Sequence, residues 1–211
     1  MIDFNYQMFN PFGPNILRAQ CPDFILDEIN KFTESSKAKP ISEDLLDRDI
    51  DVIYLTEQFC ESIKLKEFLE SLGELYKEMN PSEIEKLSLS IVPQSDNRFD
   101  GKTVMADAWV NRYRSGDFTP VHIHAADLSG IILLEVPKDP SELCFIHGNY
   151  QPWASSEWVP NQQTGEVIVF PSWLQHMVFP QKHDNERRTL SFNLIDEQTY
   201  SERKWIFSKT L

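Results

Sequence analysis

Two histidines that stand two positions apart, His122 and His124, carry the strongest chemical signal in the sequence. In a β-strand, side chains two positions apart point to the same face, so the two imidazoles would lie side by side. Such a pair can chelate one metal ion, and His176, at the start of another expected strand, offers a third imidazole. Because imidazole binds Fe, Zn, Cu and Ni, the residue types alone leave the metal open. The pattern predicts a metal site at these three histidines.

The alternative for the pair is a polar face of an edge strand, because so short a spacing also arises by chance. The surroundings favour the metal site. The pair stands among apolar strands and precedes Leu128-Ser-Gly130, so one face of its strand is expected to be interior. Interior histidines are usually satisfied by a metal ion or by hydrogen bonds. By contrast, His147 and His183 lie in turn-rich surroundings and are expected at the surface.

A second signal lies in the segment from Arg187 to Asn193. A period of two places alternate residues on one face of the expected strand: Arg187, Thr189, Ser191 and Asn193. An arginine beside hydroxyl groups suits a carboxylate, because guanidinium offers a bidentate fork and Thr189 adds a further donor. The alternative is a surface arginine that begins an edge strand.

Helical periodicity is confined to the N-terminal part of the chain. Apolar residues recur at helical spacing over residues 23–36 and from about Thr56 to Met79, where Asn80-Pro81 ends the pattern. A short strand is expected over residues 15–19, and the charged stretch before the second helix is expected to be a turn-rich connector.

After Pro81 the pattern becomes that of short strands separated by turn residues. Strands are expected over residues 87–92, 108–114, 121–124, 129–136, 143–146, 166–170, 176–179 and 189–194. Since no helical pattern lies between them, we expect an antiparallel sandwich or jelly roll in a mainly β (α+β) protein. We expect one domain, residues 1–211, in which residues 1–82 support a jelly-roll core formed by residues 83–211.

Composition limits the classes of function. The net charge of −13 makes nucleic acid an improbable partner, because phosphate backbones require clustered Lys and Arg. No apolar run is long enough to span a membrane and the first residues do not form a signal peptide, so a cytoplasmic protein is expected. The cysteines are expected to be free and buried: Cys21, Cys60 and Cys144.

Six short motifs follow one another along the second half of the chain: Trp109-x-Asn111, Gly116-Asp, His122-x-His124, Leu128-Ser-Gly130, Gly165 to Pro180 with His176 inside it, and Arg187-x-Thr189-x-Ser-Phe-Asn193. In this order and spacing they resemble the Fe(II)/2-oxoglutarate-dependent oxygenases. More narrowly, they resemble the oxygenases carried by phages, especially phages of cyanobacteria and other marine hosts. The resemblance covers roughly residues 105–195, about half of the chain.

The resemblance implies a double-stranded β-helix, which is a jelly roll, and we expect the N-terminal helices to pack on its sheet. It also implies an Fe(II) cofactor, with 2-oxoglutarate and O₂ as cosubstrates. By position, His122 would be the first metal ligand and His176 the distal ligand. Arg187 would bind the C5 carboxylate of 2-oxoglutarate, with Thr189 beside it.

Asn111 and Ser129, on neighbouring strands, would line the same pocket. The implied reaction is oxidative decarboxylation of 2-oxoglutarate to succinate, coupled to hydroxylation of a prime substrate that the sequence does not identify. A phage-encoded enzyme would work in the host cytoplasm. The N-terminal helices would either support the sheet or form the surface of a homodimer.

One position departs from the pattern of the family. The usual metal ligands are His-x-Asp/Glu and a distant His, but His124 stands at the carboxylate position. We expect His124 to be the third ligand. Two alternatives are Asp127, which would need a bend in the chain to reach the same face, and a position filled by water or halide.

Two rival functions fit part of the pattern. A cupin-like three-His dioxygenase would use the same histidines, but it would not need Arg187 and Thr189 as a dicarboxylate clamp. A non-catalytic jelly-roll binding or structural protein, for example a virion component, would hold a structural metal or none.

Residues 147–163 form a long, polar and aromatic segment, which favours a lid over an idle connector. Trp153, Trp158 and Trp173 would then border the mouth of the site. The alternative, which we favour for these tryptophans, is packing over the sandwich core.

Overall fold

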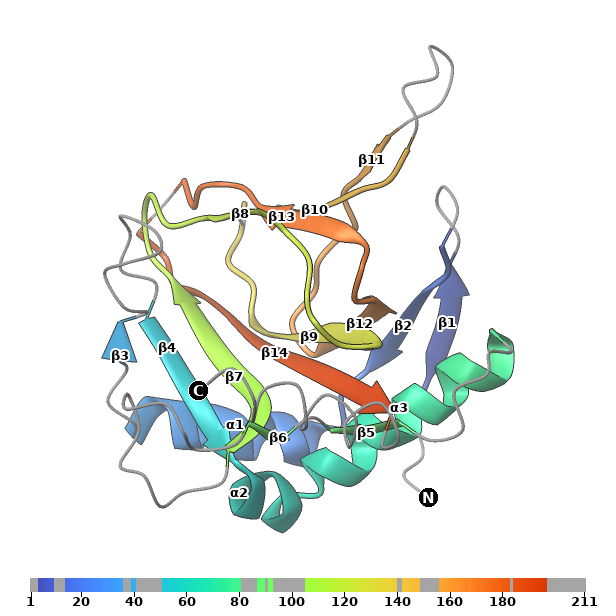
Figure 1. Ribbon diagram of the computed structural model, residues 1–211. Helices are drawn as coiled ribbons and strands as arrows, with labels where there is room; N and C mark the ends of the chain where they lie inside the picture. The colour runs from blue at the N-terminus through green and yellow to red at the C-terminus, as the bar shows by residue number, and fades with distance from the viewer. Residues whose placement is uncertain are drawn as a thin grey trace, which may run out of the picture.

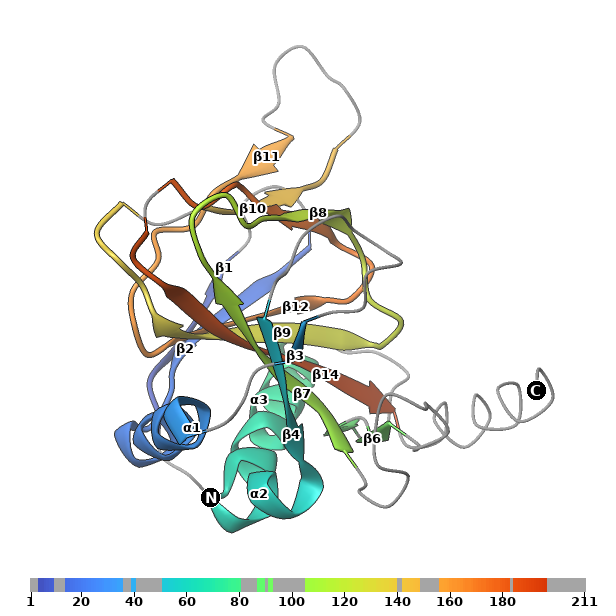
Figure 2. The ribbon, with the colours of Figure 1, turned by 90° about the vertical axis from the view of Figure 1, so that its left-hand side faces the viewer.

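The strands of the protein form two sheets that lie face to face. A computed structural model describes residues 4–9, 14–35, 39–40, 51–80, 87–89, 91–92, 105–139, 142–148, 156–182 and 184–196. Within these residues, one sheet has ten strands and the other has four. Figure 1 shows three layers, with the small sheet above the large sheet and the helices below it. The turned view of Figure 2 shows the same order.

Strands β7 to β14 run back and forth between the two sheets, as in a jelly roll. The large sheet contains the order β12-β9-β14-β7 and the small sheet has the order β11-β10-β13-β8, with antiparallel pairing throughout. The bounds are β7 (Met105–Tyr113), β8 (Thr119–His122), β9 (Leu128–Glu135), β10 (Leu143–Ile146), β11 (Glu157–Trp158), β12 (Glu166–Pro171), β13 (Gln175–Val178) and β14 (Arg187–Asp196). This double-stranded β-helix confirms the predicted fold class.

The N-terminal part extends the large sheet on both sides. Strand β2 pairs with β12, and β4 pairs with β7. The remaining bounds are β1 (Tyr6–Phe9), β2 (Ile16–Gln20), β3 (Lys39–Pro40), β4 (Asp51–Thr56), β5 (Leu87–Leu89) and β6 (Ile91–Val92). Strand β2 was predicted, but β4 was not, because its apolar residues follow a charged stretch and run directly into a helix.

In the described part of the chain, three helices cover the face of the large sheet that points away from the small sheet: α1 (Asp23–Ser35), α2 (Glu57–Ser62) and α3 (Leu65–Met79). The first confirms the predicted helix. The prediction of one continuous helix from Thr56 to Met79 is wrong, because Lys64 adopts a left-handed conformation with φ 59°. No glycine or proline marks this break. It turns the chain so that α3 buries Leu65 and Phe68 against the sheet.

Two apolar clusters occupy the two faces of the large sheet. One joins the helices to residues such as Leu190 and Phe192 of β14, and the other lies between the two sheets. Gly130 is required in the first cluster, because a Cβ atom there would lie 2.3 Å from Cζ of Phe192. The opposite face of β14 meets the inter-sheet cluster, since Arg187 pairs with Tyr113 and Thr189 with Leu133. The predicted period of two is confirmed.

The described cysteines, Cys21, Cys60 and Cys144, are free and buried as predicted. Among the residues that the structure describes, no helix has both the length and the apolar character needed to cross a membrane.

Candidate active site

The three predicted histidines come together between the two sheets. His176 of β13 lies directly opposite His122 of β8, and the ligand atoms of His122, His124 and His176 all lie within 4.8 Å of one another. The expectation that His124 belongs to the same strand as His122 is wrong, because β8 ends at His122. The backbone N–H of His124 instead donates to the carbonyl oxygen of Ser172 at 3.0 Å, and this bond holds the residue beside the cluster.

Backbone carbonyl groups orient two of the rings. Nδ1 of His122 lies 2.8 Å from the carbonyl oxygen of Pro120, and Nδ1 of His176 lies 2.9 Å from that of Leu174. Donation from Nδ1–H leaves the lone pair on Nε2, which is the usual arrangement behind a metal ligand. Nε2 of His124 lies 3.2 Å from Nε2 of His176. This separation fits two nitrogens that each lie about 2.1 Å from one ion, which places them roughly 3.0–3.4 Å apart.

Burial keeps the histidines neutral. Desolvation lowers the pKa of His176 to about 3 and that of His124 to about 4, and it also lowers the pKa of His122. The ring of His176 has Phe170 at 4.8 Å and Phe145 at 6.0 Å between centroids, which explains much of this desolvation. Near pH 7 the protons therefore do not compete with a metal ion for the imidazole lone pairs.

The alternative ligand Asp127 is not part of the cluster. Its Oδ2 accepts a hydrogen bond from the backbone N–H of Asp196 at 2.8 Å, and its backbone N–H donates to Leu194. Within the described residues, the search for groups of three metal-binding side chains finds the three histidines alone.

Arg187 lies on the same interior face of the jelly roll and is fully buried, with 0% of its surface exposed. Its Nη2 donates to Oε1 of Gln162 at 2.8 Å, and its Cζ lies 5.1 Å from the ring centroid of Tyr113. Its Nε and Nη1 are buried and have no hydrogen-bond partner among the described residues. Burial lowers the pKa of the guanidinium, and the nearby Tyr113 opposes this shift. Such an environment suits an anion, which would satisfy both the charge and the donors.

The other predicted cosubstrate residues lie on the same face. Thr189 is 2% exposed and stands opposite Asn111 in the β14–β7 pair. The side-chain amide of Asn111 donates to the hydroxyl oxygen of Ser191 at 3.0 Å. The two residues therefore lie side by side on the interior face, and their role in binding a cosubstrate stays a prediction.

Ser129 belongs to a buried polar chain at the other end of β14. Its hydroxyl donates to Oδ1 of Asn193 at 2.6 Å and lies 2.8 Å from the hydroxyl of Ser172. The amide of Asn193 in turn donates to Asp107 at 2.6 Å, and burial raises the pKa of that carboxyl. Because its hydroxyl is already bonded on two sides, Ser129 is better suited to fix the strand ends than to bind a ligand.

Two site residues were missed from the sequence, Tyr113 and Gln162. The signal for Tyr113 was present, because it stands two positions after Asn111 and so shares its face. Gln162 carries no such signal, since it lies in a polar loop without periodicity.

The aromatic residues divide as follows. Trp158 of β11 stacks on Phe145 at 5.5 Å, in agreement with packing over the core. Trp173 is 56% exposed and its ring lies 5.8 Å from that of His147, which is half-buried. Trp153 and His183 lie outside the described residues.

Comparisons with known proteins point in the same direction. Residues 107–193 match the family model described as "Putative 2OG-Fe(II) oxygenase". No curated protein matches the chain.

Similar solved structures include an oxidoreductase of the 2OG-Fe(II) oxygenase family from Burkholderia pseudomallei, with 17% identity and a TM-score of 0.56 over 85% of this chain and 86% of that chain. A Pseudomonas putida prolyl-4-hydroxylase has 15% identity and a TM-score of 0.55 over 90% and 92%. A Trichoplax adhaerens prolyl hydroxylase, in complex with a hypoxia inducible factor peptide fragment, has 15% identity and a TM-score of 0.55 over 93% of this chain and 86% of that chain.

At these identities the solved structures establish a shared fold. The family match itself covers residues 107–193, which is less than half of the chain. The family match and the three-histidine group indicate Fe(II), 2-oxoglutarate and O₂ as cofactor and cosubstrates. The relation to phage enzymes stays a prediction.

Proposed function

We propose that the protein is an Fe(II)- and 2-oxoglutarate-dependent hydroxylase in which His122, His124 and His176 hold the iron and Arg187 binds the distal carboxylate of 2-oxoglutarate. One observation carries the proposal. The interior of a single jelly roll contains three converging neutral imidazoles and a buried guanidinium, two nitrogens of which have no hydrogen-bond partner among the described residues. The first group suits a cation and the second suits an anion. A metal-bound dicarboxylic 2-oxo acid satisfies both.

The histidines provide a rigid set of donors. Hydrogen bonds from Nδ1 to backbone carbonyls fix His122 and His176, so Nε2 of each is the coordinating atom. Phe145 and Phe170 line the back of His176 and exclude water from that side. Bound Fe(II) would supply the reaction with O₂, in which 2-oxoglutarate is decarboxylated to succinate and a prime substrate is hydroxylated.

His124 takes the place of the usual carboxylate ligand in this proposal. Its Nε2 faces that of His176, whereas Asp127 is bonded to the backbone of Asp196. The exchange leaves one more positive charge at the site, because three neutral imidazoles leave two positive charges on the metal. Of the two carboxylates of 2-oxoglutarate, one would offset charge at the metal and the other would pair with Arg187.

Arg187 would fix the far end of the cosubstrate. Within the part of the chain that the structure describes, Nε and Nη1 of its guanidinium have no partner and could donate to a carboxylate, and Thr189 presents a hydroxyl from the same face of β14. Tyr113 packs its ring against the guanidinium and limits its rotation. This clamp would hold the 2-oxo acid in one orientation at the metal, which is the contribution that the protein makes to the rate.

For the prime substrate we propose only a broad class, peptides and proteins. One similar structure is a prolyl hydroxylase with a bound peptide, which supports beginning the search with peptides and proteins. The three free, buried thiols of the described residues support a reducing compartment, as in the cytoplasm.

The proposal is tested by thermal unfolding of the protein with Mn(II), a redox-inert substitute for Fe(II), with and without 2-oxoglutarate. At about 100 times the dissociation constant, a ligand adds about 2.7 kcal/mol, which moves the melting temperature by about 5–11 °C at this size. We expect a shift that requires both the metal and 2-oxoglutarate. It should vanish in Arg187→Ala and persist in Arg114→Ala, which removes a surface arginine that is paired with Asp51.

The rival functions give different results. A cupin-like three-His dioxygenase would show the metal shift but no response to 2-oxoglutarate. A jelly roll with a structural metal would show a large metal shift and a closed coordination sphere. Absence of any 2-oxoglutarate shift, while the metal alone stabilises, contradicts the oxygenase.

A further inference from the structure

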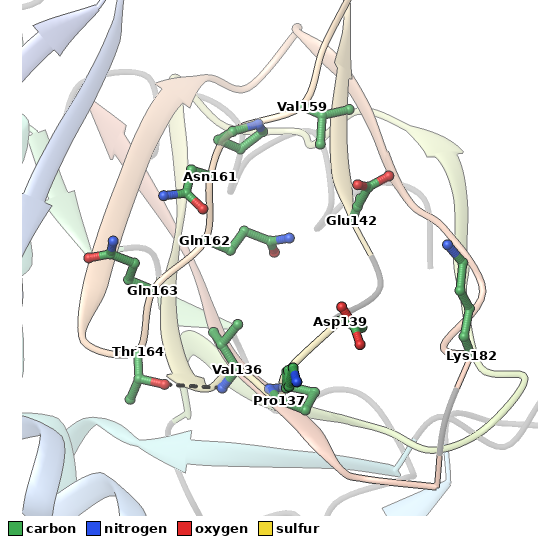
Figure 3. A pocket seen from close by; sticks show the side chains of 12 residues that line it. Val136, Pro137, Asp139, Glu142, Val159, Asn161, Gln162, Gln163, Thr164 and Lys182 are labelled. Carbon is green, nitrogen blue, oxygen red and sulfur yellow. Dashed lines mark hydrogen bonds between the residues drawn. The ribbon is translucent and has the colours of Figure 1, made fainter.

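A loop residue that no sequence motif includes, Gln162, contacts Arg187 and also lines a cavity. The cavity has a volume of about 740 Å³ and is lined by polar and charged residues that include Lys138, Glu142 and Lys182. Figure 3 shows the side chain of Gln162 extending from its loop into this cavity. Its Oε1 accepts the hydrogen bond from Nη2 of Arg187 at 2.8 Å. Gln162 therefore contacts the cavity and the buried guanidinium at once.

The bond to Gln162 restricts how Arg187 can bind a carboxylate. A guanidinium binds a carboxylate through two parallel N–H groups, either Nε with Nη2 or Nη1 with Nη2. Both forks use Nη2, which has two hydrogens. Because Gln162 accepts one of them, a single fork remains for a ligand. The amide oxygen thus orients the guanidinium and fixes the place where a carboxylate can bind.

We propose that Gln162 is a specificity-determining residue, which closes the Arg187 end of the interior site against the outer cavity and so selects 2-oxoglutarate over dicarboxylic 2-oxo acids with a longer chain. The inference rests on the proposed function. A longer acid bound at the metal would push its distal carboxylate past the guanidinium toward the amide of Gln162. Beyond that amide the 740 Å³ cavity offers space that the wild-type side chain blocks.

The test is a calorimetric titration of Mn(II)-loaded protein with 2-oxoglutarate and with 2-oxoadipate, which is longer by one methylene. Discrimination over one methylene in a closed site is about 10–200-fold, so the wild type should prefer 2-oxoglutarate at least tenfold. In Gln162→Ala this preference should fall at least tenfold. Gln162→Asn, a change of one methylene with the amide retained, should give a reduction in the same direction.

Gln163→Ala is the matched control, because Gln163 lines the same cavity from the next position in the chain. Its preference should equal that of the wild type. The melting-temperature shift caused by Mn(II) alone, unchanged in all three variants, shows that fold and metal site are intact.

The outcomes separate the inference from the proposed function. If the wild type binds 2-oxoglutarate and Gln162→Ala and Gln162→Asn keep the wild-type preference, the role of Gln162 is wrong and the oxygenase proposal stands. An equal loss of preference in Gln163→Ala also overturns it. If the wild type binds neither 2-oxo acid, the proposed function fails and the inference fails with it.

Discussion

Two neighbouring arginines of β14 are both buried, but they face opposite sides of the large sheet. Arg188 faces the helices. Its Nη1 donates to Oγ1 of Thr33 at 3.2 Å, and its Nε lies 3.2 Å from a carboxylate oxygen of Glu186, which is ion-pair distance without hydrogen-bond alignment. Arg187 faces the small sheet and, within the described residues, forms no ion pair with a carboxylate.

This difference separates a structural arginine from one that is available to a ligand. A buried cation without an anion destabilises a fold, so a protein rarely keeps one unless a partner binds there. Arg188 has its partner within the chain. For Arg187, the amide of Gln162 and the ring of Tyr113 supply only neutral contacts. The anion that completes the site is therefore expected to come from outside the chain.

Replacing each arginine by methionine should have opposite consequences. Arg187→Met should weaken the binding of 2-oxoglutarate to the Mn(II)-loaded protein at least 100-fold, because the charge-assisted contacts are lost, and should change stability by less than about 1 kcal/mol. Arg188→Met should leave the affinity unchanged and lower the free energy of unfolding by about 2 kcal/mol. Calorimetry and urea unfolding measure the two effects. Equal effects of both variants on affinity would erase the distinction.

On the face of the large sheet that the helices cover, adding side-chain volume should lower the free energy of unfolding. Gly130→Ala places a Cβ atom 2.3 Å from Cζ of Phe192 and 2.9 Å from the backbone oxygen of Ile168, so we expect a loss of about 2–3 kcal/mol in urea unfolding. The control is Gly116→Ala, where φ is +88° and no atom of the described residues, apart from the chain neighbours, lies within 4 Å of the added Cβ. A loss of about 1 kcal/mol is expected there from backbone strain. A smaller loss at Gly130 than at Gly116 would show that Phe192 moves aside.

Because the histidines of the metal site are neutral in the folded protein, the free energy of unfolding of the metal-free protein should depend on pH. The pKa of His124 is about 4 and that of His176 about 3, both below the ordinary value near 6.5. Between pH 6.5 and 4 the unfolded state binds more protons than the folded state, so stability falls as pH falls. Each histidine contributes roughly 1 kcal/mol per pH unit.

Urea unfolding with a chelator at pH 7.5 and 5.5 measures this slope. In His176→Gln the side chain cannot titrate, so the variant should show a shallower slope of unfolding free energy against pH than the wild type. A wild-type slope no steeper than that of the variant would mean that His176 is protonated as easily in the folded protein as in the unfolded chain.

Thr189→Val should give the smallest effect. It removes one hydroxyl donor from the interior face and keeps the shape of the side chain. We expect the dissociation constant of 2-oxoglutarate to rise about 3–10-fold, which corresponds to the loss of one hydrogen bond. The measurement is calorimetry, with an unchanged Mn(II) affinity as the control. An unchanged 2-oxoglutarate affinity would remove Thr189 from the carboxylate site.

The alternation of β14 could be read from the sequence because a strand has a strict period of two. That period placed Arg187 and Thr189 on one face and Leu190 and Phe192 on the other, and the pairing of β14 with both neighbours confirms it. The convergence of His122 and His176 was also predictable, since each belongs to a short expected strand and the family resemblance implied a jelly roll in which both bind the metal.

The positions that escaped prediction depend on tertiary contacts or on backbone geometry. His124 lies beyond the end of β8, held by a hydrogen bond to the carbonyl oxygen of Ser172, which the spacing of the sequence does not encode. The break at Lys64 uses a left-handed residue that is not glycine. Gln162 belongs to a polar loop, and only the fold brings it to Arg187.

The central claim, that Arg187 binds the distal carboxylate of a metal-bound 2-oxo acid, is tested most directly by a pair of matched ligands. We would titrate 2-oxoglutarate and 2-oxopentanoate, which carries a methyl group in place of the distal carboxylate, into Mn(II)-loaded wild type and Arg187→Met. The account predicts that the wild type prefers 2-oxoglutarate at least 100-fold and that the variant binds both ligands alike. Equal binding of the two ligands by the wild type, or a preference that survives in Arg187→Met, would contradict it.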